Sequence, residues 1–307
     1  MAAPLSAWLH AFRLRTLPLA VSSIIVGSGL AWYGRKAVMQ YDAFSWPALW
    51  LALLTAILLQ ILSNLANDLG DLQHGTDNVN RVGPQRAVQS GTISPALMKR
   101  AMVICGILAF TSGVLLITYA LGLRIMTLAF LLLGLTAIGA AVKYTFGKNP
   151  YGYAGLGDVS VFLFFGVVGV CGTFYLHTHS FHPAILLPAA GFGLLSAGVL
   201  NVNNMRDIHN DAASGKRTLV VRMGSANARI YHTLLVLGGL SCLVAFTLVG
   251  PSGWTSWLFL VTTPLFRPHL KRVWSVTEPS SLDPQLKVLA MGTFLTALLF
   301  ALGLILA

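Results

Sequence analysis

The chain contains very little charge. Only 9% of its 307 residues are Asp, Glu, Lys or Arg, whereas soluble domains carry about 25% charged residues. At the same time, 56% of the residues are hydrophobic. This composition excludes a water-soluble globular protein and indicates a polytopic membrane protein.

Cysteine is also scarce, and no two cysteines lie close together in the sequence. Cys105, Cys171 and Cys242 each fall inside an apolar stretch. They provide neither a disulfide framework nor a metal motif, so we expect three small buried side chains. The formal net charge of +11 comes from basic residues scattered singly and in pairs. This distribution is typical of cytoplasmic loops in membrane proteins and gives no reason to expect nucleic acid as a partner.

Long apolar stretches recur along the whole chain, and they do not alternate apolar and polar residues as the strands of a β-barrel would. Each is near the roughly 20 residues that a helix needs to cross the hydrocarbon core. The nine stretches are 17–33, 45–66, 96–120, 124–143, 154–177, 182–201, 228–250, 252–266 and 285–306. We predict an all-α, polytopic integral membrane bundle of about nine transmembrane helices in a single domain, residues 1–307.

The basic residues are divided unequally between the two sides of this predicted bundle. Only Arg35, Lys36 and Arg124 fall on the side opposite the N-terminus, and the other 17 of the 20 fall on its own side. The positive-inside rule therefore places the N-terminus in the cytoplasm and the C-terminus outside, in the bacterial cytoplasmic (inner) membrane. Residues 1–15 place Trp8 and Phe12 on one helical face, a pattern typical of a segment that lies in the membrane interface.

The few acidic residues are clustered around two polar segments, 69–95 and 205–226. Five of the nine acids lie there or at the helix ends just before them: Asp68, Asp71, Asp77, Asp207 and Asp211. Spacings of three and four residues put such side chains on one face of a helix. Both segments follow spans that lie four helices apart, and we therefore predict two pseudo-repeated four-helix units plus one helix.

Carboxylates packed this closely repel one another unless a cation lies between them. Their hard oxygen atoms select Mg²⁺, which usually keeps several waters and is completed by substrate phosphates. Basic residues are predicted on the same membrane face, among them Arg86, Lys143 and Lys216. Acids, metal and basic residues together could hold a diphosphate and neutralise its charge.

Two other interpretations of the acids stay open at this point. Asp and Asn at helix ends often cap the helix or simply face water. Acids in a membrane protein also form ion pathways, so a cation transporter is the alternative from another functional class. A transporter would place acids near the middle of the membrane, whereas these acids are predicted at one face.

Several motifs together resemble the UbiA superfamily of intramembrane prenyltransferases. They are Ser63–Asp71, Arg81–Arg86, Tyr144–Thr145 with Pro150–Asp158, Asn201–Asp211 and Gly215–Gly224. Gly75 stands where the broad superfamily places the last acid of its first motif, and Asp77 takes that role in the menaquinone-type branch. The resemblance therefore favours the branch that prenylates 1,4-dihydroxy-2-naphthoate. Branches acting on 4-hydroxybenzoate, homogentisate or haem are the alternatives.

This resemblance implies Mg²⁺-dependent transfer of a polyprenyl group from polyprenyl diphosphate to 1,4-dihydroxy-2-naphthoate, with loss of CO₂ and diphosphate, in menaquinone biosynthesis. It assigns Mg²⁺ binding to Asn67, Asp71, Asp77, Asp207 and Asp211. Diphosphate contacts are expected from Asn64, Arg81, Arg86, Lys143, Lys216 and Arg222. The catalytic set comprises Asn67, Asp68, Asp71, Asp207, Asp211 and Tyr144, with Tyr144 near the reacting carbon.

Overall fold

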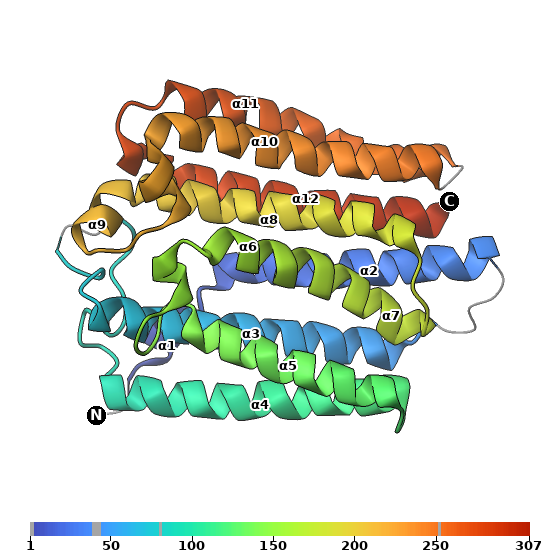
Figure 1. Cartoon of the computed structure of the whole chain (residues 1–307), viewed down its shortest axis with the longest axis horizontal. Helices are drawn as coiled ribbons and strands as arrows, with labels where there is room; N and C mark the ends of the chain where they lie inside the picture. The colour runs from blue at the N-terminus through green and yellow to red at the C-terminus, as the bar shows by residue number, and fades with distance from the viewer. Residues whose placement is uncertain (1–2, 39–43, 80–81, 251–252) are drawn as a thin grey trace.

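The structure is a computed structural model that describes residues 3–38, 44–79, 82–250 and 253–307 (Figure 1). The α-helices are α1 (Leu5–Phe12), α2 (Leu17–Val38), α3 (Trp46–Gln73), α4 (Pro95–Leu121), α5 (Ile125–Lys143), α6 (Gly157–Val161), α7 (Thr173–Thr178), α8 (Leu186–Arg206), α9 (Ile208–Ala213), α10 (Leu219–Val249), α11 (Thr263–Ser275) and α12 (Asp283–Leu306). Short 3₁₀ segments are η1 (Leu14–Thr16), η2 (Tyr151–Ala154), η4 (Pro183–Ile185), η5 (Trp254–Thr262) and η6 (Pro279–Leu282), and η3 (Phe162–Gly172) is a π-helix. No strand occurs in these described ranges, which confirms the all-α prediction.

Eight helical stretches within the described part of the chain are long and apolar enough to cross a membrane. They match eight of the nine predicted spans, so this is a multi-pass membrane protein. The predicted span 252–266 differs from the others. Ser252 lies outside the described residues, and η5 and α11 form a stretch whose second half carries Arg267, Lys271 and Arg272. These charges end the apolar stretch that begins in η5. α11 nevertheless lies alongside α10 (Figure 1).

Helix starts follow from local side-chain chemistry. The hydroxyls of Ser45, Ser94 and Thr218 each accept a hydrogen bond from a backbone N–H three residues later, at 3.3 Å. Such N-caps satisfy donors that the first helical turn leaves free. α3 continues to Gln73, beyond the apolar stretch 45–66, so the helical spacing expected for the acidic motif holds through Asp71. This extension keeps Asn67 and Asp71 on a rigid helix.

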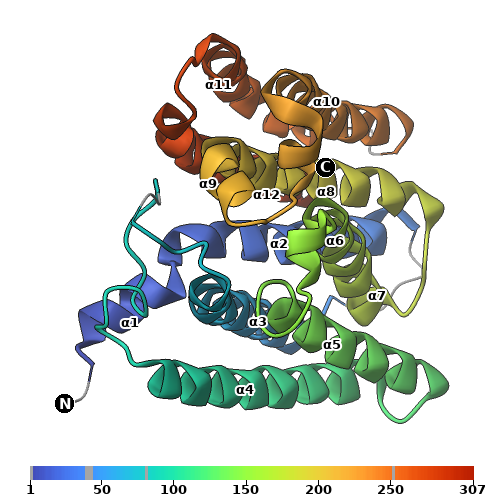
Figure 2. The same cartoon turned by 60° about the vertical axis from the view of Figure 1, so that its left-hand side comes forward.

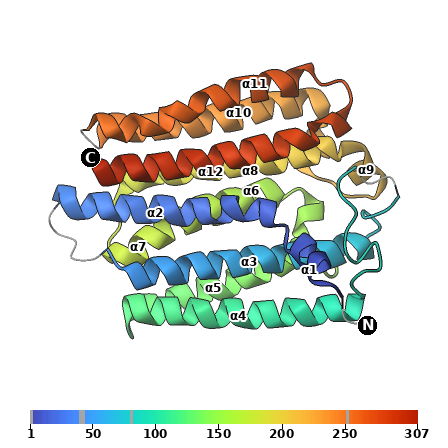
Figure 3. The ribbon, with the colours of Figure 1, turned by 180° about the vertical axis from the view of Figure 1, so that it is seen from behind.

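The helices are arranged in layers, which Figures 2 and 3 show from two further directions. α12 packs against α2 and α8, α10 packs against α8, and α3 packs against α4. Glycines allow the closest of these approaches: a Cβ on Gly166 would lie 2.8 Å from the Cα of Gly193. Such contacts let the two helices approach closely.

The segments 74–79 and 82–94 and helix α9 lie at the same end of the bundle as the N-terminus, and the C-terminus lies at the opposite end (Figure 1). α3 and α8 run to this shared end and carry the two acidic motifs there. The fold thus brings together two sequence segments that lie more than a hundred residues apart. The single-domain assignment, the internal repeat and the interfacial position of residues 1–15 remain predictions.

Candidate active site

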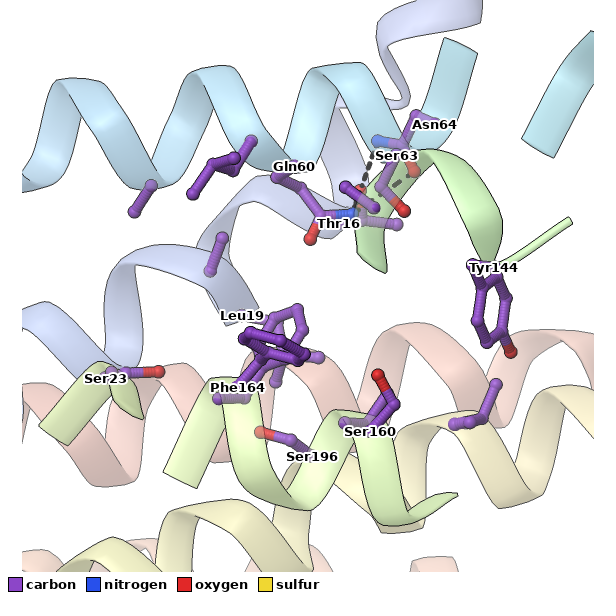
Figure 4. A pocket seen from close by; sticks show the side chains of 18 of the residues that line it. Thr16, Leu19, Ser23, Gln60, Ser63, Asn64, Tyr144, Ser160, Phe164 and Ser196 are labelled. Atoms are coloured by element: carbon purple, nitrogen blue, oxygen red, sulfur yellow. Dashed lines mark hydrogen bonds between the residues drawn. The ribbon is translucent and has the colours of Figure 1, made fainter. Parts of the chain in front are cut away.

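A cavity of about 580 Å³ lies between α2, α3, α5, η3, α8 and α12. Its end near the acidic motifs is lined by polar side chains, among them Asn67, Asp71 and Lys216. The rest of the wall is largely apolar and includes Phe130 and Leu176. Figure 4 shows part of this chamber, with the Gln60, Asn64 and Thr16 group on one wall and Leu19 and Phe164 on another. The cavity therefore combines a charged head with an apolar body.

Lys216 connects the two acidic motifs. Its Nζ lies 3.9 Å from Oδ1 of Asp71 on α3 and 3.5 Å from Oδ1 of Asp211 on α9. The Tyr153 hydroxyl donates a hydrogen bond of 2.9 Å to the same oxygen of Asp71. Both carboxylates and the ammonium group are buried. The two acidic motifs, which were predicted at one membrane face, therefore meet at Asp71 and Asp211.

Burial alone would lower the pKa of Lys216, but the adjacent carboxylates of Asp71 and Asp211 raise it above its ordinary value. Lys216 therefore stays cationic. Burial raises the pKa of Asp211 to about 6, although Lys216 opposes that shift. The two buried carboxylates thus share the ammonium group of Lys216.

Asp77 lies beside Arg86, whose Nε is 3.7 Å from its Oδ2. The chain reaches this position through Gly75, whose φ of +73° is in the left-handed region that favours glycine. This backbone conformation gives a physical reason for glycine at that position of the motif. The two acidic segments are also tied to each other, because the Asn210 amide donates to the carbonyl of Thr76 at 2.8 Å.

Arg206 holds Asp207 in the second motif. Its Nε and Nη2 donate to the two carboxylate oxygens of Asp207 at 2.8 and 2.6 Å, and its Nη1 donates to Asp283 on α12 at 2.6 Å. The guanidinium group is buried, and both Arg206 and Asp283 line the cavity. Neither residue was predicted from the sequence. An Arg next to an Asp is an ordinary surface pattern, and nothing in the sequence pairs residue 206 with residue 283.

The side chains of the other predicted residues on α3 have different hydrogen-bond partners. The Thr145 hydroxyl donates to Oδ1 of Asn67 at 2.8 Å, and Asn67 lines the cavity. Asn64 also lines it, but its amide donates to the Phe12 carbonyl and so supports the segment before α2. Asp68 accepts hydrogen bonds from the backbone N–H groups of Ala87 and Val88, both at 3.2 Å. Its carboxylate therefore holds the segment that carries Arg86.

The predicted basic residues are not all at the cavity. Arg86 and Lys216 line it. Lys143 is exposed and donates to the Lys148 carbonyl, while Arg222 donates to the Ala154 carbonyl at 2.8 Å. Arg81 lies outside the described residues. Three further basic residues that were not predicted, Arg13, Arg15 and Lys287, line the cavity as well.

Tyr144 lines the cavity next to the charged head (Figure 4). Its ring packs edge-on against Tyr151, with ring centroids 5.4 Å apart. Burial raises the pKa of the Tyr144 phenol above its ordinary value, so the hydroxyl stays protonated at neutral pH. It is thus a neutral hydrogen-bond donor at the boundary between the charged and apolar parts of the cavity.

The donor set at the head suits Mg²⁺ better than a transition metal. Oδ2 of Asp211 is buried and has no hydrogen-bond partner among the described residues. Within those same residues, no three His, Cys, Asp or Glu side chains are close enough to enclose an ion. Mg²⁺ needs few protein ligands, because it retains water and binds substrate phosphates. The residues present therefore fit a magnesium ion that is held jointly with a phosphate group.

The chain is similar in sequence to known proteins. Residues 29–296 match the UbiA prenyltransferase family. The chain is 46% identical over 301 residues to 1,4-dihydroxy-2-naphthoate octaprenyltransferase from Escherichia coli (strain K12), covering 98% of this chain and 96% of that protein. It is 37% identical over 304 residues to the protein of the same name from Mycobacterium leprae (strain TN), again covering 98% and 96%.

The fold is also similar to solved structures. The apo structure of a UbiA homolog from Aeropyrum pernix K1 has a TM-score of 0.68 at 17% identity, covering 92% of this chain and 97% of that chain. A UbiA homolog from Archaeoglobus fulgidus bound to GPP and Mg²⁺ has a TM-score of 0.63 at 16% identity, covering 98% and 100%. Together with the acidic motifs at the head of an apolar membrane cavity, these matches show that the chain belongs to the UbiA prenyltransferase family.

Proposed function

We propose that this protein transfers a polyprenyl group from polyprenyl diphosphate to 1,4-dihydroxy-2-naphthoate, with release of CO₂ and diphosphate, as a step of menaquinone biosynthesis. The observation that carries this proposal is the meeting of Asp71, Asp211 and Lys216 at the head of the apolar cavity. The high identity to two proteins named for this reaction supports the choice of acceptor.

The charged head would bind the diphosphate. Lys216 and Arg86 line it and supply positive charge toward the phosphate oxygens. Asn67, Asp71, Asp77, Asp207 and Asp211 are the residues that would hold Mg²⁺ together with phosphate oxygens. When bound, Mg²⁺ would neutralise the charge that develops on the departing diphosphate.

The apolar body of the cavity would hold the allylic carbon and exclude water from the cation that forms when the C–O bond breaks. The electron-rich naphthoate ring then attacks that carbon, and the ring loses its carboxylate as CO₂. Tyr144 would lie next to the reacting carbon, where its neutral phenol cannot compete as an anionic nucleophile. The apolar wall of the cavity supports a lipid-soluble donor.

We further propose that the site opens on the cytoplasmic side of the bacterial inner membrane. The 17 to 3 distribution of basic residues supports this orientation, as does the position of the N-terminus beside the acidic segments. The lipid bilayer would then surround the protein and also contain the polyprenyl diphosphate that it uses as donor.

The decisive experiment combines purified protein, 1,4-dihydroxy-2-naphthoate, a polyprenyl diphosphate and Mg²⁺, with product mass as the readout and a chelator as control. We expect demethylmenaquinol that disappears with the chelator. A product formed only with 4-hydroxybenzoate or another aromatic would overturn the acceptor and keep the reaction class. If folded protein forms no product with any acceptor, the prenyltransferase proposal is wrong, and metal flux into proteoliposomes would then test the transporter alternative.

A further inference from the structure

A group of three polar side chains lines the cavity away from its charged head. Thr16 lies just before α2, and Gln60 and Asn64 lie on α3. Gln60 is in the middle of the 28-residue helix α3, where apolar residues such as Leu19 form the adjacent wall. Polar side chains at such a depth in a membrane are uncommon and usually serve a function. The amide of Gln60 therefore needs an explanation beyond helix packing.

The hydrogen bonds of this group determine which atom of Gln60 is the free acceptor. The backbone carbonyl of Phe12 can only accept, so the Asn64 atom 2.9 Å from it is the donor Nδ2. Asn64 Oδ1 can only accept as well, so the Gln60 atom 3.2 Å from it is the donor Nε2. Nε2 also donates to Oγ1 of Thr16 at 3.4 Å. Both hydrogens of Nε2 are thus directed into the protein, and Oε1 is left as the acceptor.

Oε1 of Gln60 faces the open chamber. In Figure 4 it lies on the side of Gln60 that is turned toward Leu19 and Phe164 across the cavity. Among the described residues, Gln60 forms side-chain hydrogen bonds through Nε2 and none through Oε1. A carbonyl oxygen without a donor is unfavourable in a largely apolar chamber. A ligand that supplies an O–H or N–H group there would relieve this cost.

The aromatic acceptor is the one proposed reactant that can supply this hydrogen. The polyprenyl chain has no polar hydrogen, and the diphosphate presents oxygen atoms that accept. The 1-hydroxyl of the dihydroxynaphthoate lies next to the 2-carboxylate and can donate to it within the molecule, whereas the 4-hydroxyl has no such neighbour. Oε1 would repel the carboxylate itself, because both are acceptors. The 4-hydroxyl is therefore the group that matches Gln60.

The position of Gln60 along α3 leaves room for this arrangement. Gln60 precedes Asp71 by 11 residues, which corresponds to about 16 Å along the helix axis. Eleven residues are close to three complete turns, so the two side chains lie on the same side of α3, and both line the cavity. The diphosphate, the reacting carbon and the aromatic ring can therefore lie between Asp71 and Gln60.

We propose that Oε1 of Gln60 accepts a hydrogen bond from the 4-hydroxyl of the dihydroxynaphthoate, and that Thr16 and Asn64 are positioning residues that hold the Gln60 amide in this orientation. This inference rests on the proposed prenyl transfer and identifies where its acceptor is recognised. Gln60 is thus a specificity-determining residue that selects acceptors with a free hydroxyl at this position.

The test compares two aromatic acids that differ only in the 4-hydroxyl, 1,4-dihydroxy-2-naphthoate and 1-hydroxy-2-naphthoate. Isothermal titration calorimetry gives their dissociation constants with Mg²⁺ and inorganic pyrophosphate present, so that no turnover occurs. Gln60→Met removes the carbonyl oxygen and keeps an unbranched side chain. It should weaken binding of the dihydroxy compound about tenfold and that of the monohydroxy compound by less than about twofold. Gln73→Met is the matched control on α3 and should leave both affinities unchanged, because Gln73 is exposed and lies outside the cavity.

Gln60→Asn withdraws the carbonyl oxygen by one methylene group and tests the same contact if Gln60→Met yields little folded protein. An equal loss of affinity for both compounds, or no loss for either, would overturn the inference. Equal affinity of the wild-type protein for the two compounds would overturn it as well. Wild-type protein that forms no prenylated product from 1,4-dihydroxy-2-naphthoate would instead contradict the proposed function, so the two failures are distinguishable.

Discussion

Arg206 binds both carboxylate oxygens of Asp207 while it also reaches Asp283 at the start of α12. One buried guanidinium group thus serves an acid of the second motif and an acid outside both motifs. Because both Arg206 and Asp283 line the cavity, this arrangement joins the end of α8 to α12 at the site itself. It also fixes the position of the Asp207 carboxylate, which would otherwise be free to move in water.

Replacing Asp283 by Asn should weaken the grip of Arg206 and so disturb Asp207. Residues that orient metal ligands typically account for 10- to 100-fold in metal affinity or activity, and we expect a loss of about that size in both kcat/KM and Mn²⁺ affinity. Mn²⁺ titration followed by electron paramagnetic resonance measures the second quantity without turnover. Glu278→Gln is the control, since Glu278 is exposed and contacts only nearby serines. Equal behaviour of the two variants would contradict this role of Asp283.

Asp71→Asn and Asp211→Asn should each remove most turnover and leave the fold intact. Each substitution removes a negative charge from the head of the cavity and leaves Lys216 with one carboxylate partner. Loss of one preorganised electrostatic contact to a reacting group typically costs about 10²- to 10³-fold in rate. Single-turnover rates at saturating Mg²⁺, with thermal unfolding measured in parallel, provide the check. Near-normal rates in both variants would exclude these acids from the reaction.

Asp68→Ala should mainly lower the stability of the protein, and its effect on activity should be a consequence of that. It removes the acceptor of two buried backbone N–H groups, those of Ala87 and Val88, and each unsatisfied donor costs about 1–3 kcal/mol. We expect a lower Tm and faster proteolysis within residues 82–94. Activity should fall because Arg86 loses its support. Asp71→Asn should show neither the lower Tm nor the faster proteolysis, and a variant of Asp68 with normal proteolysis would contradict the structural role.

The sequence identified the acids of the site more reliably than their partners. Asp71, Asp211 and Lys216 could be predicted, because charge is so rare in this chain that clustered charges indicate a site. The different tasks of Asp68 and Asp71 could not be predicted, since a helical spacing defines a face but not which neighbour covers each part of it. Arg206 and Asp283 were missed for a related reason. Their pairing depends on the packing of α12 against α8, which no local pattern encodes.

The long apolar spans were predicted well, because hydrocarbon thickness sets their length. Their polar ends depend on contacts with other segments. α3 continues through Asn67, Asp68 and Asp71 because its polar side chains find partners in Thr145, in the backbone at 87–88 and in Tyr153. Tertiary contacts thus extend a helix beyond the point where the apolar pattern ends.

The pKa of Asp211 makes Mg²⁺ binding depend on pH. Burial raises this pKa to about 6, so below pH 6 the carboxyl is protonated and must release its proton before it can bind a cation. The affinity for Mg²⁺ should therefore fall as the pH drops below about 6, by up to about tenfold per pH unit if Asp211 alone titrates. Mn²⁺ titrations between about pH 5 and pH 7.5, the range in which this carboxyl changes charge, measure the slope.

The raised pKa of Asp211 also affects the stability of the metal-free protein. Mg²⁺ affinity should rise with pH, whereas this stability should fall. Because the folded state favours the protonated carboxyl, the stabilising contribution of Asp211 is full below its unfolded pKa of about 4 and is lost as the pH rises toward about 6. Without metal, Tm should therefore decline over this window, and Mg²⁺ should reverse the decline at the upper end. Asp211→Asn removes the titrating group and should abolish both effects. A metal-free Tm that has the same pH profile in Asp211→Asn and wild type would show that other groups control this dependence.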